Sequence, residues 1–255
     1  MRKLLAAWAF ALAACGGDDG GAPAGPPSTP SAGTADINLL FMGNSHTSTH
    51  GLPDMVAGLV RGVRPGRTVR SVVAPGWMFL DERATDAPSV ELLRGGGWSH
   101  VVLQAQKYSS SGMFEYSTSG TEALIRTARA VNATPVLFPE WPRRGVAETA
   151  VIYDLHASIA QREPACVAPV GQAWDLALAR QPSLVLHAAD GNHSAPAGAF
   201  LAAAIIAATI ANVSPDAFAP LDGIDVDLQL QAQLRAIAAE TVLVYRPRRH
   251  CPNDP

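Results

Sequence analysis

The stretch Asn38-Leu39-Leu40-Phe41-Met42-Gly43-Asn44-Ser45-His46-Thr47 decides the fold expected of this chain. Its apolar run, residues 39–42, predicts a first β-strand that stops at Gly43 and is followed at once by a serine. Residues just beyond the carboxyl end of a strand lie where α/β proteins bind ligands. Ser45 is therefore a candidate nucleophile. The alternative is that Ser45 only caps the helix that follows.

Short apolar runs and helical patterns alternate along the rest of the chain. This alternation is typical of a parallel sheet that helices cover on both faces. We therefore expect an α/β fold, a three-layer α/β/α sandwich around a central parallel sheet of about five strands. The expected strands span residues 39–42, 68–73, 100–104, 135–138 and 167–170; the expected helices span 53–63, 89–94, 120–131, 147–162, 172–179, 196–211 and 228–239; and 241–245 is a short apolar run that would add an edge strand.

The composition fits one globular domain with a sizeable core. Of the 255 residues, 48% are apolar and 16% are charged, and the formal net charge is −3. One α/β domain of about 200 to 220 residues is the size expected of such a chain. The negative net charge argues against nucleic acid as a partner.

The N-terminus has the pattern of an export signal. Arg2 and Lys3 form its charged end, residues 4–11 its apolar core, and Leu12-Ala13-Ala14-Cys15 its ending of small residues before a cysteine. That ending resembles a bacterial lipobox, which implies a lipid on Cys15 and an exported protein anchored to the cell envelope, in the outer membrane facing the periplasm or the surface. The alternative is an ordinary signal peptide with a chance cysteine. The apolar run is too short for a transmembrane helix.

Three regions are expected: a signal peptide over residues 1–15, a tether over 16–36 and a folded domain over 37–255. The tether is rich in Gly, Pro, Ala, Ser and Thr, which bury too little apolar area to fold. In an exported protein the remaining cysteines, Cys166 and Cys251, meet an oxidising compartment. A disulfide between them is one expectation, and two unrelated thiols are the other.

A second motif, Asp190-Gly191-Asn192-His193, contains the groups that would activate a serine. A serine hydroxyl is a poor nucleophile until an imidazole accepts its proton, and that imidazole needs an anion on its other nitrogen. Asp190 and His193 provide both from one loop. Asp-x-x-His alone is a weak signal because it is common in loops, but its position before a late helix, together with Gly-Asn-Ser after the first strand, strengthens it.

In these motifs the sequence resembles the SGNH hydrolase superfamily, also called GDSL-type esterases. Gly43-Asn44-Ser45 matches the family's first block with Asn in place of Asp, Gly76 matches the glycine after the second strand, and Asp190 with His193 matches the last block. The resemblance implies a flavodoxin-like sheet. Ser45 would attack an ester, with His193 as general base and Asp190 orienting its ring. The amides of Ser45 and Gly76 would hold the oxyanion, and no metal or organic cofactor is implied.

The third block departs from the family's pattern. After this strand the family usually shows Gly-x-Asn-Asp, whereas the chain reads Gln104-Ala105-Gln106-Lys107. A glutamine side-chain amide donates to an oxyanion as asparagine does, so either Gln104 or Gln106 is expected to complete the oxyanion hole. The alternative is that both are polar residues at a strand end without a role in the reaction.

Other residues near these motifs are weaker candidates. Asn44, His46, Trp77 and Trp141 are candidates for lining the substrate site, although large aromatic residues more often pack in a core. His46 and His50 lie four apart, a spacing that binds a metal on a helix, but no Glu accompanies them. We therefore expect no metal site.

The segments expected to border the site contain Ser, Thr, Gly and single aromatic residues, without a long apolar run to line an acyl tunnel. They span residues 46–50, 75–80 and 107–116. Because a buried methylene contributes only where apolar wall receives it, we expect an esterase for short acyl groups, with acetyl groups on a carbohydrate as one substrate class. A lipase or thioesterase, a non-catalytic carbohydrate-binding module on the same fold, and a metal-dependent hydrolase are the alternatives. The expected partners are a small-molecule or carbohydrate ester and, through the lipid alone, a membrane.

Overall fold

The structure is a computed structural model that describes residues 33–252. The predicted signal peptide, with Cys15, and the predicted tether as far as residue 32 lie outside the described residues. At the centre is a five-stranded sheet in the order β2-β1-β3-β4-β5, and every neighbouring pair of strands is parallel. The strands are β1 (Ile37–Met42), β2 (Val69–Val73), β3 (His100–Gln104), β4 (Thr134–Phe138) and β5 (Cys166–Val167).

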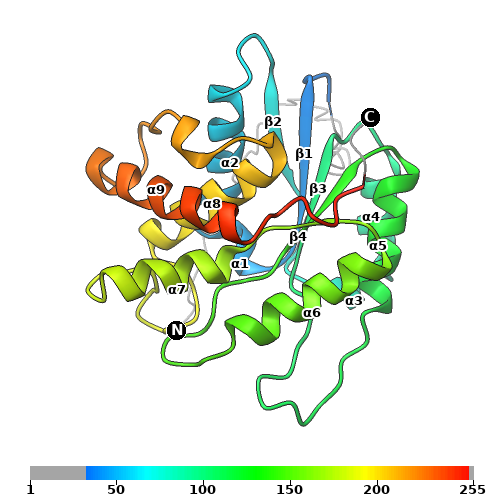
Figure 1. Ribbon diagram of the computed structural model, residues 1–255. Helices are drawn as coiled ribbons and strands as arrows, with labels where there is room; N and C mark the ends of the chain where they lie inside the picture. The colour runs from blue at the N-terminus through cyan, green and yellow to red at the C-terminus, as the bar shows by residue number, and fades with distance from the viewer. Residues whose placement is uncertain (1–32, 253–255) are drawn as a thin grey trace, which may run out of the picture.

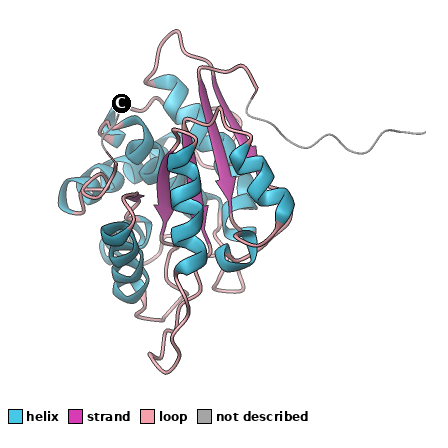
Figure 2. Ribbon diagram, turned by 90° about the vertical axis from the view of Figure 1, so that its right-hand side faces the viewer, coloured by secondary structure: helices cyan, strands magenta, loops and turns pink. Residues whose placement is uncertain are grey.

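Helices cover both faces of this sheet (Figures 1 and 2), which makes the expected three-layer sandwich. They are α1 (Ser45–Ser48), α2 (Leu52–Gly62), α3 (Leu80–Arg83), α4 (Ala87–Arg94), α5 (Ser119–Ala130), α6 (Thr149–Arg162), α7 (Val170–Arg180), α8 (Pro196–Ala211) and α9 (Leu228–Val244), with short 3-10 turns at Thr49–Gly51 and Pro215–Ala217. Alternate residues of a strand point to opposite faces. Leu39 and Phe41 pack with α2, α7, α8 and α9, whereas Leu40 and Met42 pack with α4, α5 and α6. Since both faces are covered, the strands are continuous apolar runs in the sequence.

Helix α8 is buried on all sides, from Ala197 to Ala211. Its small side chains allow neighbouring segments to approach closely. A Cβ at Gly198 would lie 2.3 Å from the carbonyl oxygen of Leu186 and 2.5 Å from the ring of Trp174. Because α8 begins shortly after His193, this packing fixes the position of the loop that contains His193.

Two predicted strands near the C-terminus are wrong in part or in full. The strand expected over residues 167–170 is limited to Cys166–Val167, and Val170 already begins α7. The run 241–245, expected as an edge strand, is the last turn of α9, which continues to Val244, and the Thr241 hydroxyl donates to the Ile237 carbonyl as in a helix. A short apolar run does not by itself distinguish a strand from a helix.

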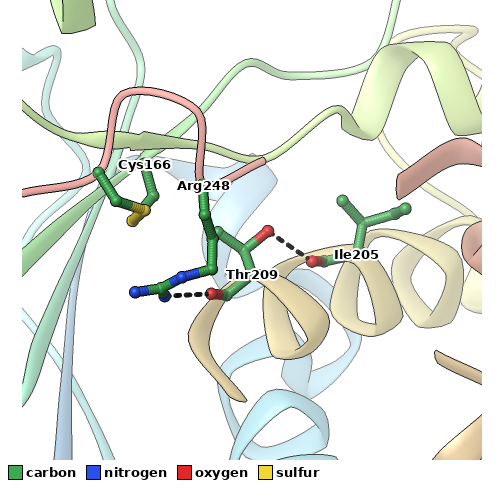
Figure 3. Close-up of a disulfide and its surroundings, with 5 residues drawn as sticks. Cys166, Ile205, Thr209 and Arg248 are labelled. Carbon is green, nitrogen blue, oxygen red and sulfur yellow. Dashed lines mark hydrogen bonds between the residues drawn. A yellow bond between two sulfur atoms is a disulfide. The ribbon is translucent and has the colours of Figure 1, made fainter. Parts of the chain in front are cut away.

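A disulfide joins Cys166 of β5 to Cys251, 85 residues further along the chain. Figure 3 shows this bond beside Arg248, whose guanidinium donates to the carbonyl of Thr209 in α8 at 3.0 Å. The Val167 amide donates to the Pro247 carbonyl at 2.9 Å. The described C-terminal segment is therefore held against the edge of the sheet. No helix within residues 33–252 is long and apolar enough to cross a bilayer.

Candidate active site

The turn after β1 places Ser45 at the carboxyl end of the sheet, where α/β proteins bind ligands. Asn44 caps α1, because its side-chain oxygen accepts a backbone amide of the first turn at 3.0 Å. The cap is therefore Asn44, which leaves the Ser45 hydroxyl available for other contacts. Close packing requires glycine at position 43, since a Cβ there would lie 2.2 Å from Thr47 Oγ1 and 2.5 Å from Gln104 Oε1.

Ser45, His193 and Asp190 form one hydrogen-bonded line. Ser45 Oγ lies 2.9 Å from His193 Nε2, and His193 Nδ1 lies 2.5 Å from Asp190 Oδ2. The other carboxylate oxygen accepts the amides of Asn192 and His193 at 2.9 and 3.0 Å. The hydrogen bond with His193, together with these two amides, holds the pKa of the Asp190 carboxyl well below its usual range. An ionised carboxylate there places the imidazole proton on Nδ1 and leaves Nε2 to accept a proton from Ser45.

The loop that contains Asp190 and His193, residues 190–193, is called the acid–base loop below. The segment after β4 holds it in place. The Arg144 amide donates to the Gly191 carbonyl at 2.8 Å, and the Arg144 guanidinium donates to the Ala188 carbonyl at 2.6 Å. The indole of Trp141 donates to the carbonyl of the acid–base loop at Asn192, at 2.8 Å. These contacts hold the loop in the position in which the His193 imidazole is aligned with Ser45.

Comparison with known proteins identifies the fold. No protein-family model matches the sequence, and no match was found among curated proteins. Among solved structures, a candidate SGNH hydrolase from Slackia heliotrinireducens is 27% identical, with a TM-score of 0.52, over 67% of this chain and 97% of that one. A DUF4886 family protein from Bacteroides uniformis aligns with a TM-score of 0.61 at 14% identity, over 83% of this chain and 96% of that one, and this likeness concerns the fold alone.

The first of these similarities extends over nearly the whole of the Slackia protein. The part of this chain that is described has a five-stranded parallel sheet with helices on both faces, as expected for such a fold. The chain has the SGNH hydrolase fold. The fold class expected from the sequence is confirmed, and so is the resemblance to this superfamily at the level of the fold.

In this SGNH fold the segment after β2, residues 74–78, lies alongside the turn of the candidate nucleophile, residues 43–45, which is called the nucleophile turn below. The Ala74 amide donates to the Phe41 carbonyl at 2.8 Å, and the Met78 amide donates to the Gly43 carbonyl at 3.3 Å. Gly76 has a φ of +75°, a backbone conformation that favours glycine. Among the described residues, neither the Gly76 amide nor the Ser45 amide donates to a protein acceptor. Two backbone donors are thus free to bind an oxyanion.

Both glutamines of the third block, Gln104 and Gln106, form hydrogen bonds within the protein. Gln104 Oε1 accepts the Asn44 amide at 3.0 Å and the Thr47 hydroxyl at 2.8 Å, and its Nε2 donates to Glu140 at 2.7 Å. Gln104 therefore supports the nucleophile turn from beneath.

Gln106 is turned toward the start of α5. Its Nε2 donates to the carbonyls of Lys107 and Ser117 at 2.8 and 3.2 Å, and its Oε1 accepts the Thr121 hydroxyl at 2.6 Å. Both amide protons of Gln106 are thus used within the protein. Gln106 therefore has no amide proton left for an oxyanion, whereas Gln104 donates one of its two amide protons to Glu140. The role of Gln104 as an oxyanion donor stays a prediction.

Glu140 lies two residues after the end of β4, in the segment 140–144 that the sequence places at the site edge of the sheet, either shaping the pocket or forming a solvated loop. Burial raises the pKa of its carboxyl, which accepts the Gln104 amide. Burial and the nearby Glu140 also raise the pKa of Tyr108. Both side chains line a pocket of about 350 Å³ together with Phe79, Gln106, Lys107 and Tyr116. The position of Glu140 at the carboxyl end of a parallel strand was the signal available in the sequence.

The aromatic candidates differ in exposure. Trp77, next to Gly76, is 71% exposed, so it is available to contact a substrate. Trp141 is buried and stacks on Trp174 with ring centroids 4.7 Å apart. The prediction that Trp141 lines the substrate site is therefore wrong, because its ring packs in the core beneath the acid–base loop. A large apolar ring gains most free energy when it is fully buried.

The two histidines considered as metal ligands bind backbone carbonyls. His46 Nε2 lies 3.2 Å from the Asn192 carbonyl, and His50 Nε2 lies 3.0 Å from the Ser194 carbonyl. Within residues 33–252 no group of three or more His, Cys, Asp or Glu side chains is arranged to hold a metal ion. Both histidines fasten the segment after β1 to the residues around His193.

Proposed function

We propose that the chain is a serine ester hydrolase in which Ser45 is the nucleophile. The observation that supports this most is the line of hydrogen bonds from Ser45 Oγ through His193 to Asp190. His193 Nε2 takes the Ser45 proton as Oγ bonds to the acyl carbon, and Asp190 stabilises the imidazolium that results. The proton is then given to the leaving alcohol, which leaves an acyl-enzyme on Ser45.

Water completes the cycle. His193 takes a proton from a water molecule that attacks the acyl carbon, and returns it to Ser45 as the carboxylic acid leaves. In both halves the oxyanion binds to the amides of Ser45 and Gly76, which sit on adjacent turns of the fold. Donors fixed before the reaction stabilise the charge without reorganisation, and one such donor is worth about 10² to 10³ in kcat.

The shape of the site favours short acyl groups. The exposed Trp77 and the pocket beside Glu140 offer aromatic and polar surfaces, without a long aliphatic channel among the residues described at this edge. Each buried methylene is worth about 0.8 kcal/mol only where apolar wall receives it. We therefore propose short esters as substrates, with acetyl groups on a carbohydrate as the class that suits an aromatic and polar surface. Comparing kcat/KM from acetyl to palmitoyl esters tests this, and an optimum at long chains would point to a lipase or thioesterase.

Labelling with a fluorophosphonate probe tests the reaction itself. The probe should form a covalent adduct that peptide mapping locates on Ser45, and Ser45→Ala should abolish both the adduct and ester hydrolysis. Ser48→Ala is the matched control, because Ser48 belongs to the same short helix and its hydroxyl, within residues 33–252, donates to the Asn44 carbonyl alone. A folded wild-type protein without adduct or turnover would refute the proposal and favour a carbohydrate-binding module. Loss of turnover on treatment with a chelator would favour a metal-dependent hydrolase.

The location of the protein is also a proposal. We propose that a lipid on Cys15 anchors the domain to the bacterial cell envelope and that residues 16–36 act as a tether. The sequence pattern of the N-terminus supports this, as do the paired cysteines, which suit an exported chain.

A further inference from the structure

Arg83, the last residue of α3, is completely buried, and its guanidinium binds backbone carbonyls. Nη2 donates to the carbonyls of Gly43 at 2.7 Å and Gly76 at 2.6 Å. Nη1 donates to the carbonyl of Pro75 at 3.2 Å and to the Ser89 hydroxyl at 3.0 Å. No carboxylate of the described chain lies within 4.0 Å of this guanidinium to form a salt bridge with it.

Burying an unpaired cation costs several kcal/mol unless dipoles surround it. Here the surrounding dipoles belong to two turns, since one nitrogen binds a carbonyl of the nucleophile turn and a carbonyl of the segment after β2. Compensation is incomplete, because Arg83 Nε is buried without a hydrogen-bond partner in residues 33–252. A core built only for stability would favour an apolar side chain at such a position. Stability alone therefore does not explain a buried arginine at position 83, and we look for its role in the turns that it contacts.

The hydrogen bond to the Pro75 carbonyl indicates that role, because it orients the Gly76 amide. The Pro75 carbonyl and the Gly76 amide belong to one planar peptide group, so a hydrogen bond that fixes the carbonyl also fixes the direction of the N–H. Donation to a carbonyl further polarises the peptide and strengthens its N–H as a donor. Gly76, at a φ of +75°, has a backbone that is free to adopt other conformations when nothing holds it.

We propose that Arg83 is a positioning residue for the oxyanion hole. Its guanidinium holds the Pro75–Gly76 peptide with the N–H directed at the site, and ties that peptide to the turn of the nucleophile. Its charge, buried behind the donors, adds a favourable potential where the oxyanion forms. This inference rests on the proposed ester hydrolysis and extends it to a residue that does not touch the substrate.

The test compares two variants of Arg83 with a matched arginine elsewhere. Arg83→Lys keeps the charge but loses the planar fork that binds several carbonyls, and Arg83→Met loses both. Arg61 is the control, because its guanidinium donates to the Val69 carbonyl at the opposite end of β2 at 3.0 Å. For each protein, kcat and KM for p-nitrophenyl acetate are measured per labelled active site, together with the inhibition constant of a boronic acid that mimics the tetrahedral intermediate.

We expect Arg83→Met to lower kcat about 100-fold with KM nearly unchanged, as for loss of an oxyanion donor. The inhibition constant of the boronic acid should rise by a similar factor. The kcat of Arg83→Lys should lie between the kcat of Arg83→Met and that of the wild type. Arg61→Met should keep the wild-type kcat. Folded Arg83 variants that keep kcat overturn the proposal, as does a rise in KM alone. If Arg83→Met does not fold, Arg83→Lys decides, and if neither folds Arg83 is a structural residue. A wild-type protein that neither hydrolyses the ester nor binds the fluorophosphonate refutes the proposed function instead.

Discussion

The ring of His46 stacks on the ring of His193, with centroids 5.1 Å apart and planes inclined by 16°. His46 also donates from Nε2 to the Asn192 carbonyl at 3.2 Å and packs against Trp141 at 5.0 Å. The imidazole proposed as general base is thus supported on one face by a second imidazole that binds the same loop. Its position depends on this neighbour as well as on Asp190.

His46→Ala should lower kcat about tenfold while the protein stays folded, because a general base displaced by a fraction of an ångström accepts the proton less well. His46→Phe keeps the stacked ring but loses the hydrogen bond to Asn192, so its kcat should lie between those of the wild type and His46→Ala. Steady-state kinetics with circular dichroism as a folding control measures this. Equal activity in all three proteins would show that the stack has no influence on the reaction.

Asp190→Asn should lower kcat by about 10³ to 10⁴ while the fold persists. The amide oxygen of asparagine still accepts the two loop amides, but its NH₂ group favours the wrong imidazole tautomer. Retention of a tenth or more of wild-type turnover in the folded variant would remove Asp190 from the proposed mechanism.

The same pair of proteins should differ in the pH dependence of stability. The pKa of Asp190 is lowered in the folded state by the hydrogen bond with His193 and by the backbone amides of Asn192 and His193. Its contribution to stability is therefore present in full above the pKa of an unfolded aspartate, about 4, and is lost as the pH falls below that value. The difference in Tm between wild type and Asp190→Asn should shrink as the pH is lowered below about 4. A difference that stays constant over that range would contradict the lowered pKa.

Replacing both cysteines of the disulfide, Cys166→Ser with Cys251→Ser, should lower the free energy of unfolding. For a closed loop of 85 residues, the chain-entropy estimate is about 4 to 5 kcal/mol, and measured losses are commonly about 2 to 4. Denaturant unfolding of oxidised wild type, reduced wild type and the double variant measures this. The reduced wild type should match the double variant, and no change on reduction would mean that the two thiols are not joined in solution.

Cys15→Ser should move the protein from the detergent-requiring membrane fraction to a soluble periplasmic or secreted fraction, since one lipid-bearing cysteine is the proposed anchor. Fractionation of cells that express each form, with a salt wash to remove proteins held by charge, provides the measurement. Cys251→Ser is a suitable control, because it removes a cysteine without touching the N-terminus. A variant that remains in the washed membranes would refute the lipid anchor.

The sheet and the position of the serine could be predicted from the sequence because both depend on local patterns. A buried parallel strand is a continuous apolar run, and the glycine that ends β1 marks the turn where Ser45 stands. The pairing of Asp190 with His193 was predictable for the same reason, since both belong to one short loop. The strand predicted over residues 241–245 is wrong, because a short, largely apolar run fits the last turn of a helix as well as a strand.

The contacts that support the site could not be predicted, because they join segments that are distant in sequence. Gln104 is bound to Glu140 and to the nucleophile turn, and Arg83 is bound to two turns that precede it by up to 40 residues. A glutamine after a strand is compatible with an oxyanion donor and with a buried support. Which of these two roles the side chain has depends on the acceptors within its reach. Those acceptors are set by the packing of β3 against β4, which places Glu140 beside Gln104.

The stacking of Trp141 on Trp174 has an optical consequence. Trp141 donates its indole N–H to the carbonyl of Asn192, and both rings are shielded from water, so the ultraviolet emission of this pair depends on whether the acid–base loop is seated. Displacement of the loop would break that hydrogen bond and admit water to the indole, which shifts emission to longer wavelength. The protein thus contains an intrinsic fluorophore at the loop that holds its imidazole, and the seating of that loop is open to measurement without an added dye.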